Sequence, residues 1–349
     1  IETLTFYPGT PVNTSVLWAN VGGCIIMGFL SEDQALFRLK DIEARIPAED
    51  LQDDARRTAH QTAHKKAVPL YIGLTTGFCG SLTSFSTFMR DAFIALANDL
   101  PVPIGTYSDI SLYTPASTQS SAPNGGFSFM ALVAVFFTEI GLSIVCLFLG
   151  AHLAIYLSPW TPRIPQRLLR TAVDPTMVIF ACLSWAAVTC LVVLLPEFPK
   201  HTTLWSSQTW RGPVLFSLVF APVGCLARFY LAIKLNNRIV SFPLGTFVAN
   251  ASGTMVLGMA YSLQHAPISS SNLGGGSFIG CEVLQGIMDG FCGCITTVST
   301  WVLELSDLQR GHAYIYGFTT VAVGLCALIV EIGSLKWTRG LTTPLCSAY

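Results

Sequence analysis

GFCGSLTSFSTF at residues 77–88 returns as GFCGCITTVSTW at residues 290–301, with seven of twelve positions identical. Each copy lies in a long apolar stretch, where its glycines and hydroxyl residues are poor helix formers. Irregular backbone at bilayer depth needs protein, ion or water partners. A repeated, interrupted span of this kind indicates a transport site at the interface between two repeats. The alternative is a glycine-rich seam for close helix packing.

The composition places both stretches in a membrane protein. Of the 349 residues, 52% are hydrophobic and only 11% are charged, whereas soluble domains carry about 25% charged residues. Windows of about 20 apolar residues predict eight helical spans. They lie near residues 15–30, 68–97, 127–156, 176–195, 212–234, 243–263, 278–304 and 313–335. The sequence therefore predicts an all-α, polytopic membrane protein.

The eleven cysteines do not indicate a disulfide framework, because most of them fall in apolar spans and are expected to act as small hydrophobic side chains. The sequence shows neither a nucleophile–base cluster nor a metal-ligand cluster. We therefore do not expect an enzyme.

The repeat is larger than the opening stretch. LWANVGGCIIMG at residues 17–28 matches FVANASGTMVLG at residues 247–258, which places Asn20 opposite Asn250. Five membrane passes separate these two spans, so the copies are expected to insert in opposite orientations, as in inverted-repeat transporters and channels. In the second copy a span containing Arg228 precedes the Asn span, so we expect a ninth span upstream of Ile1.

Three regions follow from this pattern: a first repeat at 1–156, a connector with one transmembrane helix at 157–210, and a second repeat at 211–349. Lys and Arg gather in the loops 31–67, 157–175, 235–242 and 305–312. Basic loops mark the cytoplasmic side. The C-terminus and the loop 98–126 are then expected to face outward.

Taken together, these features resemble the fluoride channel family (Fluc, formerly called CrcB), in its eukaryotic two-repeat exporter form. The resemblance rests on the repeated stretch, the two Asn spans, the GCLAR run at 224–228 and the connector between inverted copies. It implies a passive fluoride-selective channel of the plasma membrane that exports fluoride and confers fluoride resistance. It also implies a monomer, because the fused repeats replace two subunits. Nothing in the sequence indicates a nucleic-acid partner.

A fluoride path has to replace the ion's water with hydrogen-bond donors such as hydroxyl and amide NH2 groups. Aromatic ring edges are positive and favour an anion without a fixed charge. By resemblance, the path is lined by Asn20, Phe85, Ser86, Thr87, Phe88, Asn250, Val298, Ser299, Thr300 and Trp301. For the two Asn residues, the alternative role is hydrogen bonding between helices.

The two copies differ at their aromatic positions, since Val298 and Trp301 stand where the first copy has Phe85 and Phe88. By resemblance, one path would combine Phe85 with Trp301, and the other Phe88 with Val298. We expect the Val-containing path to be vestigial, which leaves one conducting pore.

The resemblance also implies a structural Na+ ion at the repeat interface. Its ligands would be the backbone carbonyls of Gly80, Thr83, Gly293 and Thr296, although the same residues would also permit a simple close helix crossing. Arg228 would lie near the cytoplasmic mouth. There it either attracts anions or extends toward the interface and caps neighbouring carbonyls.

A second function remains open, a proton-coupled transporter of another small anion. It rests on Glu139 and Glu331, because acidic residues within spans are typical of proton relays. The two residues do not align between the copies, since Glu139 falls opposite Thr320. This mismatch disfavours a repeated proton site.

Overall fold

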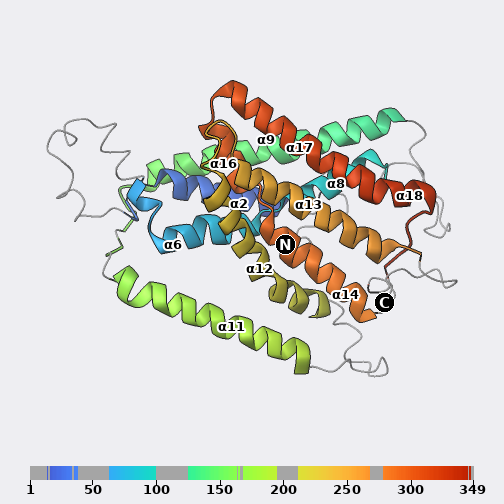
Figure 1. Cartoon of the computed structure of the whole chain (residues 1–349). Coiled ribbons are helices and arrows are strands. Elements are labelled where there is room, and N and C mark those ends of the chain that lie inside the picture. Colours follow the sequence, from blue (N-terminus) through green and yellow to red (C-terminus); the bar gives the residue numbers. More distant parts are fainter. Residues whose placement is uncertain are drawn as a thin grey trace, which may run out of the picture.

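The computed structural model describes residues 14, 16–33, 35–37, 63–99, 125–162, 164–165, 168–194, 211–267, 278–344 and 346. Every regular element in these ranges is a helix, and the helices pack as a bundle (Figure 1). The predicted all-α class is confirmed. Most of the predicted loops 31–67 and 98–126 falls outside the described residues.

The first half of the chain holds a helix, a broken helix and a second long helix. They are α2 (Leu17–Glu32), then α6 (Pro69–Ile72), η1 (Gly73–Cys79), α7 (Gly80–Leu82) and α8 (Phe85–Leu96), and finally α9 (Gly125–Leu157). The η segments are π-helical. The connector region contains η2 (Leu169–Val173) and α11 (Asp174–Leu194).

The second half begins with a helix that has no counterpart among the described residues of the first half, and it then follows the same order. Its elements are α12 (Arg211–Leu235), α13 (Leu244–His265), α14 (Phe278–Gly286), η3 (Ile287–Cys292), α15 (Gly293–Ile295), α16 (Ser299–Asp307), α17 (Arg310–Leu328), η4 (Ile329–Gly333) and α18 (Ser334–Thr338).

Five helical stretches of the described chain are long and apolar enough to cross a bilayer. They are Ser128–Leu157, Thr171–Leu194, Val214–Leu235, Ile279–Asp307 and Arg310–Thr338. The helix Leu17–Glu32 is apolar but has only 16 residues. Helix α13 has 22 residues and is more polar, because it contains several glycines and threonines and Asn250. These residues face the protein interior. The molecule is therefore a multi-pass membrane protein.

Both copies of the repeated stretch break their helix at a threonine. Thr83 (φ −97°, ψ 141°) ends α7 and Thr296 (φ −90°, ψ 154°) ends α15, each with extended backbone. Ser84 then caps α8 by accepting the N–H of Thr87. A π-helical segment precedes each break, a feature often found at functional sites.

Contacts between helices fix their relative directions. For α2 and the broken helix, Asn20 contacts Ser84 and Gly23 contacts Leu82. For α8 and the last long helix, Phe85 contacts Gly324 and Phe93 contacts Trp337. For α13 and that same helix, Phe242, just before α13, contacts Tyr316, and Gly258 contacts Leu328. Accordingly, α2 runs antiparallel to the broken helix of the first half, whereas α8 and α13 both run parallel to α17 (Figure 1). Helices α2 and α13 thus run in opposite directions, which is the arrangement that an inverted repeat requires.

Helices α2 and α9 touch backbone to backbone. A Cβ atom on Gly28 would overlap the carbonyl oxygen of Leu147, and one on Gly150 would overlap that of Ile25. Small residues at such positions let membrane helices approach closely. This contact fixes α2, and with it Asn20, against α9.

We expect Gly28→Ala to push α2 away from α9 and to lower the thermal midpoint of the purified protein, since overpacking costs about 1–3 kcal/mol. Gly22→Ala is the matched control on the same helix, because nothing lies within 4 Å of its Cβ position. Thermal unfolding followed by size-exclusion chromatography gives both midpoints. Equal midpoints for the two variants would contradict the packing described here.

The connector helix α11 lies along one edge of the bundle and packs on α12 (Figure 1). Its Trp185 Nε1 donates to the carbonyl oxygen of Val219 at 3.0 Å. None of its residues is buried, and its exposed apolar side chains suit contact with lipid.

Lys65 binds backbone carbonyl groups at the C-terminal end of α2. Its Nζ donates to the carbonyl oxygens of Ser31 (2.8 Å) and Asp33 (2.6 Å) and lies 5.2 Å from the centre of the Tyr71 ring. Burial lowers the pKa of Lys65 from 10.5 to about 8, and the nearby Asp33 carboxylate opposes that shift. A cation at this place also complements the negative end of the helix dipole.

Candidate functional site

The two broken helices cross at their breaks, and hydroxyl groups join them there. Thr83 Oγ1 accepts the N–H of Val298 (3.2 Å) and the N–H of Ser299 (3.1 Å). In the mirrored contact, Thr296 Oγ1 accepts the N–H of Ser86 at 3.1 Å. All these groups are buried. Each half thus accepts hydrogen bonds from backbone N–H groups of the other half. Without the other half, these buried N–H groups would lose their partners.

The two Asn residues hold the backbone just after each break. Asn20 Oδ1 accepts the N–H of Ser84 (3.0 Å), and Asn250 Oδ1 accepts the N–H of Thr297 (2.8 Å). The two amide NH2 groups differ: that of Asn250 donates to the carbonyl of Thr297 (3.1 Å), whereas that of Asn20 donates to Glu139 Oε2 (3.0 Å). The halves are therefore chemically unequal at this point.

Four carbonyl groups lose their helical partners at the breaks. In a continuous α-helix, the carbonyl of residue i accepts the N–H of residue i+4. Here the N–H groups of Ser84 and Thr297 go to the Asn side chains, and those of Thr87 and Thr300 go to the hydroxyls of Ser84 and Thr297. The carbonyls released in this way belong to Gly80, Gly293, Thr83 and Thr296.

The aromatic residues of the two copies form one continuous edge-to-face series. Phe136 contacts Phe88 (5.8 Å between ring centroids), Phe88 contacts Phe85 (5.7 Å), and Phe85 contacts Trp301 (5.4 Å). The structure thus brings Phe85 and Trp301 together as one pair. It also joins Phe85 directly to Phe88, so the two predicted aromatic sets are neighbours rather than separate groups.

The chain as a whole matches known proteins. The family model described as CrcB-like protein, Camphor Resistance (CrcB), matches residues 3–151 and 215–332. The chain belongs to the CrcB-like family. Two matched stretches on either side of an unmatched connector agree with two repeats in one chain.

Several curated relatives of this CrcB-like chain carry transport names. Fluoride export protein 1 of Neurospora crassa is 45% identical over 97% of this chain, which spans 64% of that protein's length. Fluoride export protein 1 of Candida albicans is 32% identical over 98% of this chain and 76% of its own length. The fluoride-specific ion channel FluC of Chromobacterium violaceum is 32% identical over 37% of this chain and 98% of its own length. No solved structure gives a significant match.

In this CrcB-like chain, Arg228 lies inside the protein and is only 2% exposed. Its Nε donates to the carbonyl of Cys294 (2.8 Å), and one terminal nitrogen donates to Ser81 Oγ (3.3 Å). The guanidinium occupies the space that a side chain on Gly80 would fill. These contacts agree with the carbonyl-capping role, whereas the predicted position near the cytoplasmic mouth stays a prediction.

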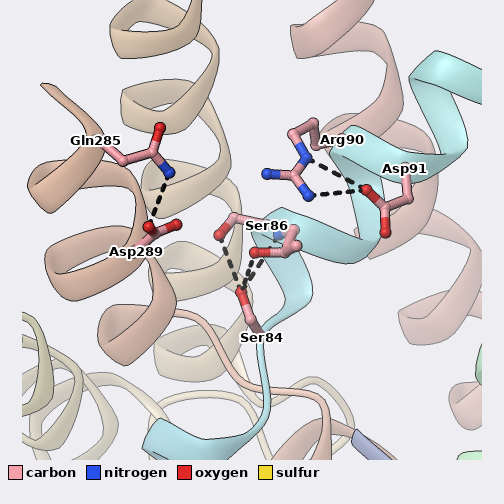
Figure 2. A network of polar contacts seen from close by, with 7 residues as sticks. Ser84, Ser86, Arg90, Asp91, Gln285 and Asp289 are labelled. Atoms are coloured by element: carbon pink, nitrogen blue, oxygen red, sulfur yellow. Dashed lines mark hydrogen bonds and ion pairs between the residues drawn. The ribbon is translucent and has the colours of Figure 1, made fainter. Parts of the chain in front are cut away.

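Arg90 and Asp91 pair on α8, beyond the serines of the break. Arg90 contacts Asp91 Oδ1 at 3.1 Å, and Gln285 donates to Asp289 Oδ2 at 2.7 Å on the facing helix. Figure 2 shows these two polar pairs on either side of the Ser84–Ser86 segment. Polar groups thus continue from the break toward the C-terminal end of α8.

Two features of the CrcB-like chain were missed by sequence reasoning. Glu304 accepts hydrogen bonds from Thr246 (2.7 Å), Tyr316 (2.7 Å) and Asn236 (3.2 Å). A disulfide joins Cys281 and Cys346. Glu304 lies 213 residues after Asp91, the same offset as the repeated stretch, and this spacing was the signal that could have revealed it.

Proposed function

We propose that this chain is a passive, fluoride-selective channel that exports fluoride across the plasma membrane. The observation that carries the proposal is the buried crossing of two broken helices, where α8 and α16 begin. Helix N-termini attract anions, and Thr87 and Thr300 hydroxyls at these ends accept hydrogen bonds, which leaves their own protons free to be donated. The names of the fungal and bacterial relatives support the choice of fluoride.

Passive export is sufficient for this role. A negative cell interior drives an anion outward with about 2.3 kcal/mol per 100 mV. The chain would act as a monomer, because the two halves already supply each other's hydrogen-bond partners at the crossing.

We propose that one path conducts, the one lined by Phe85 and Trp301. Phe136 and Glu139 lie one turn apart on α9, and Phe136 contacts Phe88. Glu139 is buried, and its Oε1 has no hydrogen-bond partner among the described residues. A buried acidic group beside the Phe88 path disfavours an anion there, which supports conduction through the other path.

We propose that Na+ is bound where the two breaks cross. The four carbonyls of Gly80, Thr83, Gly293 and Thr296 have lost their helical N–H partners, as described above, and oxygen ligands suit a hard cation. Bound there, Na+ would neutralise the carbonyl dipoles of both breaks. Its role would be structural.

Two separate features support an orientation in which the disulfide end faces outward. Disulfides persist in oxidising compartments, and Cys281 and Cys346 lie at the C-terminal end of α13, where Gln264 donates to the Cys281 carbonyl. Lys65 and the start of α13 lie at the opposite end. The disulfide end is therefore expected to face outward, as the basic loops predict.

Cell-surface labelling tests this orientation. In intact cells, an impermeant reductant followed by an impermeant maleimide is expected to label the wild type but not the Cys281→Ser/Cys346→Ser variant. Labelling that requires permeabilised cells would reverse the proposed orientation.

Growth of a fluoride-sensitive strain tests the function itself. Cells that express the chain are expected to grow at fluoride concentrations that stop cells with an empty vector, because the passive outward path keeps internal fluoride low. Equal sensitivity of both strains, with the protein present in the plasma membrane, would contradict the proposal.

A proton-coupled transporter of a small anion is the second candidate, and buried Glu139 favours it. Glu139→Gln separates the two functions, since glutamine cannot carry a proton through the cycle. The channel proposal expects this variant to retain fluoride export, whereas a proton-coupled mechanism expects export to be lost.

A further inference from the structure

We infer that the indole N–H of Trp301 donates a hydrogen bond to the fluoride ion in the conducting path. This inference rests on the proposed function and names the group that binds the ion at that position. Trp301 Nε1 is buried and has no hydrogen-bond partner among the described residues. A buried donor without a partner is costly, and such groups are rare in folded proteins.

The location of the indole agrees with this role. Its ring meets Phe85 edge to face, and its Cζ2 atom lies 3.9 Å from the Cβ position of Gly317 on α17. Cζ2 is bonded to the ring carbon that carries Nε1, so the N–H lies close to the interface between α16 and α17.

The neighbouring polar groups on this side already form hydrogen bonds that do not involve the indole. The Thr320 hydroxyl donates to the carbonyl of Tyr316 (2.7 Å), and the Tyr316 hydroxyl donates to Glu304 Oε2 (2.7 Å). Glu304 also accepts from Thr246 and Asn236, so four donors of this cluster are satisfied without the indole. The Trp301 N–H thus remains available to a ligand that accepts hydrogen bonds.

The chemistry fits fluoride better than it fits a larger apolar guest. Fluoride is a compact acceptor, and hydrogen bonds to ionised acceptors are about twice as strong as neutral ones. A phenylalanine at this position would offer only the weakly positive edge of its ring. Tryptophan supplies a ring edge and a true donor together.

Liposomes reconstituted with the full chain test the inference. Trp301→Phe keeps an aromatic ring but removes the N–H. We expect the half-saturating fluoride concentration to rise about tenfold, as for the loss of one charge-assisted hydrogen bond. Trp185→Phe is the matched control, because it removes an indole N–H whose partner is the Val219 carbonyl on the connector side. That control is expected to conduct like the wild type.

A measurement on the unmutated protein makes the test independent of folding defects. With 15N-labelled tryptophan, the Trp301 indole resonance, assigned by its loss in Trp301→Phe, is expected to shift with NaF and not with equal NaCl. An unshifted resonance, or wild-type half-saturation in the folded Trp301→Phe variant, would overturn the inference. If wild-type liposomes pass no fluoride, the proposed function fails instead.

Discussion

Thr83→Val is expected to abolish fluoride efflux and to destabilise the protein. Valine has nearly the shape of threonine but cannot accept the N–H groups of Val298 and Ser299. Each buried donor left without a partner costs about 1–3 kcal/mol. Because these two bonds join the halves of the chain, their loss opens the crossing itself. Fluoride efflux from liposomes and the thermal midpoint of the purified protein measure both effects.

Two control variants show whether the loss of the Thr83 hydroxyl causes these effects. Thr83→Ser keeps the hydroxyl and loses only the methyl group that fills the space above Gly23, so most of the efflux should return. Thr138→Val removes a hydroxyl that donates to its own helix at Ala134 and should behave like the wild type. A stable, conducting Thr83→Val protein would show that the halves do not depend on this contact.

Phe85→Ala is expected to reduce fluoride efflux by about a hundredfold or more, equivalent to about 2.8 kcal/mol. Phe88→Ala should stay within about twofold of the wild type, because positive ring edges favour the ion in one path only. Phe85 pairs with Trp301, whereas Phe88 lies on the side of Phe136 and the buried Glu139. Val298→Phe, which restores a ring in the second path, should add no conduction while Glu139 remains.

Both phenylalanines are buried, and truncation to alanine costs about 3–5 kcal/mol of stability. Efflux is therefore compared per folded protein, after size-exclusion chromatography. Phe85→Leu and Phe88→Leu are the volume-matched pair, since leucine removes the ring edge but leaves less of a cavity. Equal losses from the two positions would argue for two working paths.

The sequence predicted the helix breaks well because their cause is local. Gly, Thr and Ser in an apolar stretch weaken the helix, and the breaks fall at Thr83 and Thr296 in both copies. The Asn residues were also placed at the site, where Asn20 and Asn250 hold the backbone beyond each break. These features repeat along the chain and can therefore be found without a structure.

The differences between the halves could not be predicted in this way. Alignment of the copies set Glu139 opposite Thr320, but it could not show that Glu139 bonds Asn20 across 119 residues. Arg228 was expected near the cytoplasmic mouth, and only the structure shows that its guanidinium fills the space that a side chain on Gly80 would take. Likewise, the partner of Cys281 lies 65 residues away, beyond the last predicted span.

Fluoride efflux from liposomes, measured with a fluoride electrode and without a pH gradient, tests the central claim most directly. A potassium gradient with valinomycin sets the voltage, and protein-free liposomes give the background. The account predicts rapid fluoride release down its electrochemical gradient, while chloride stays inside liposomes loaded with it. Release that occurs only with an imposed proton gradient, or no release above background, would contradict it.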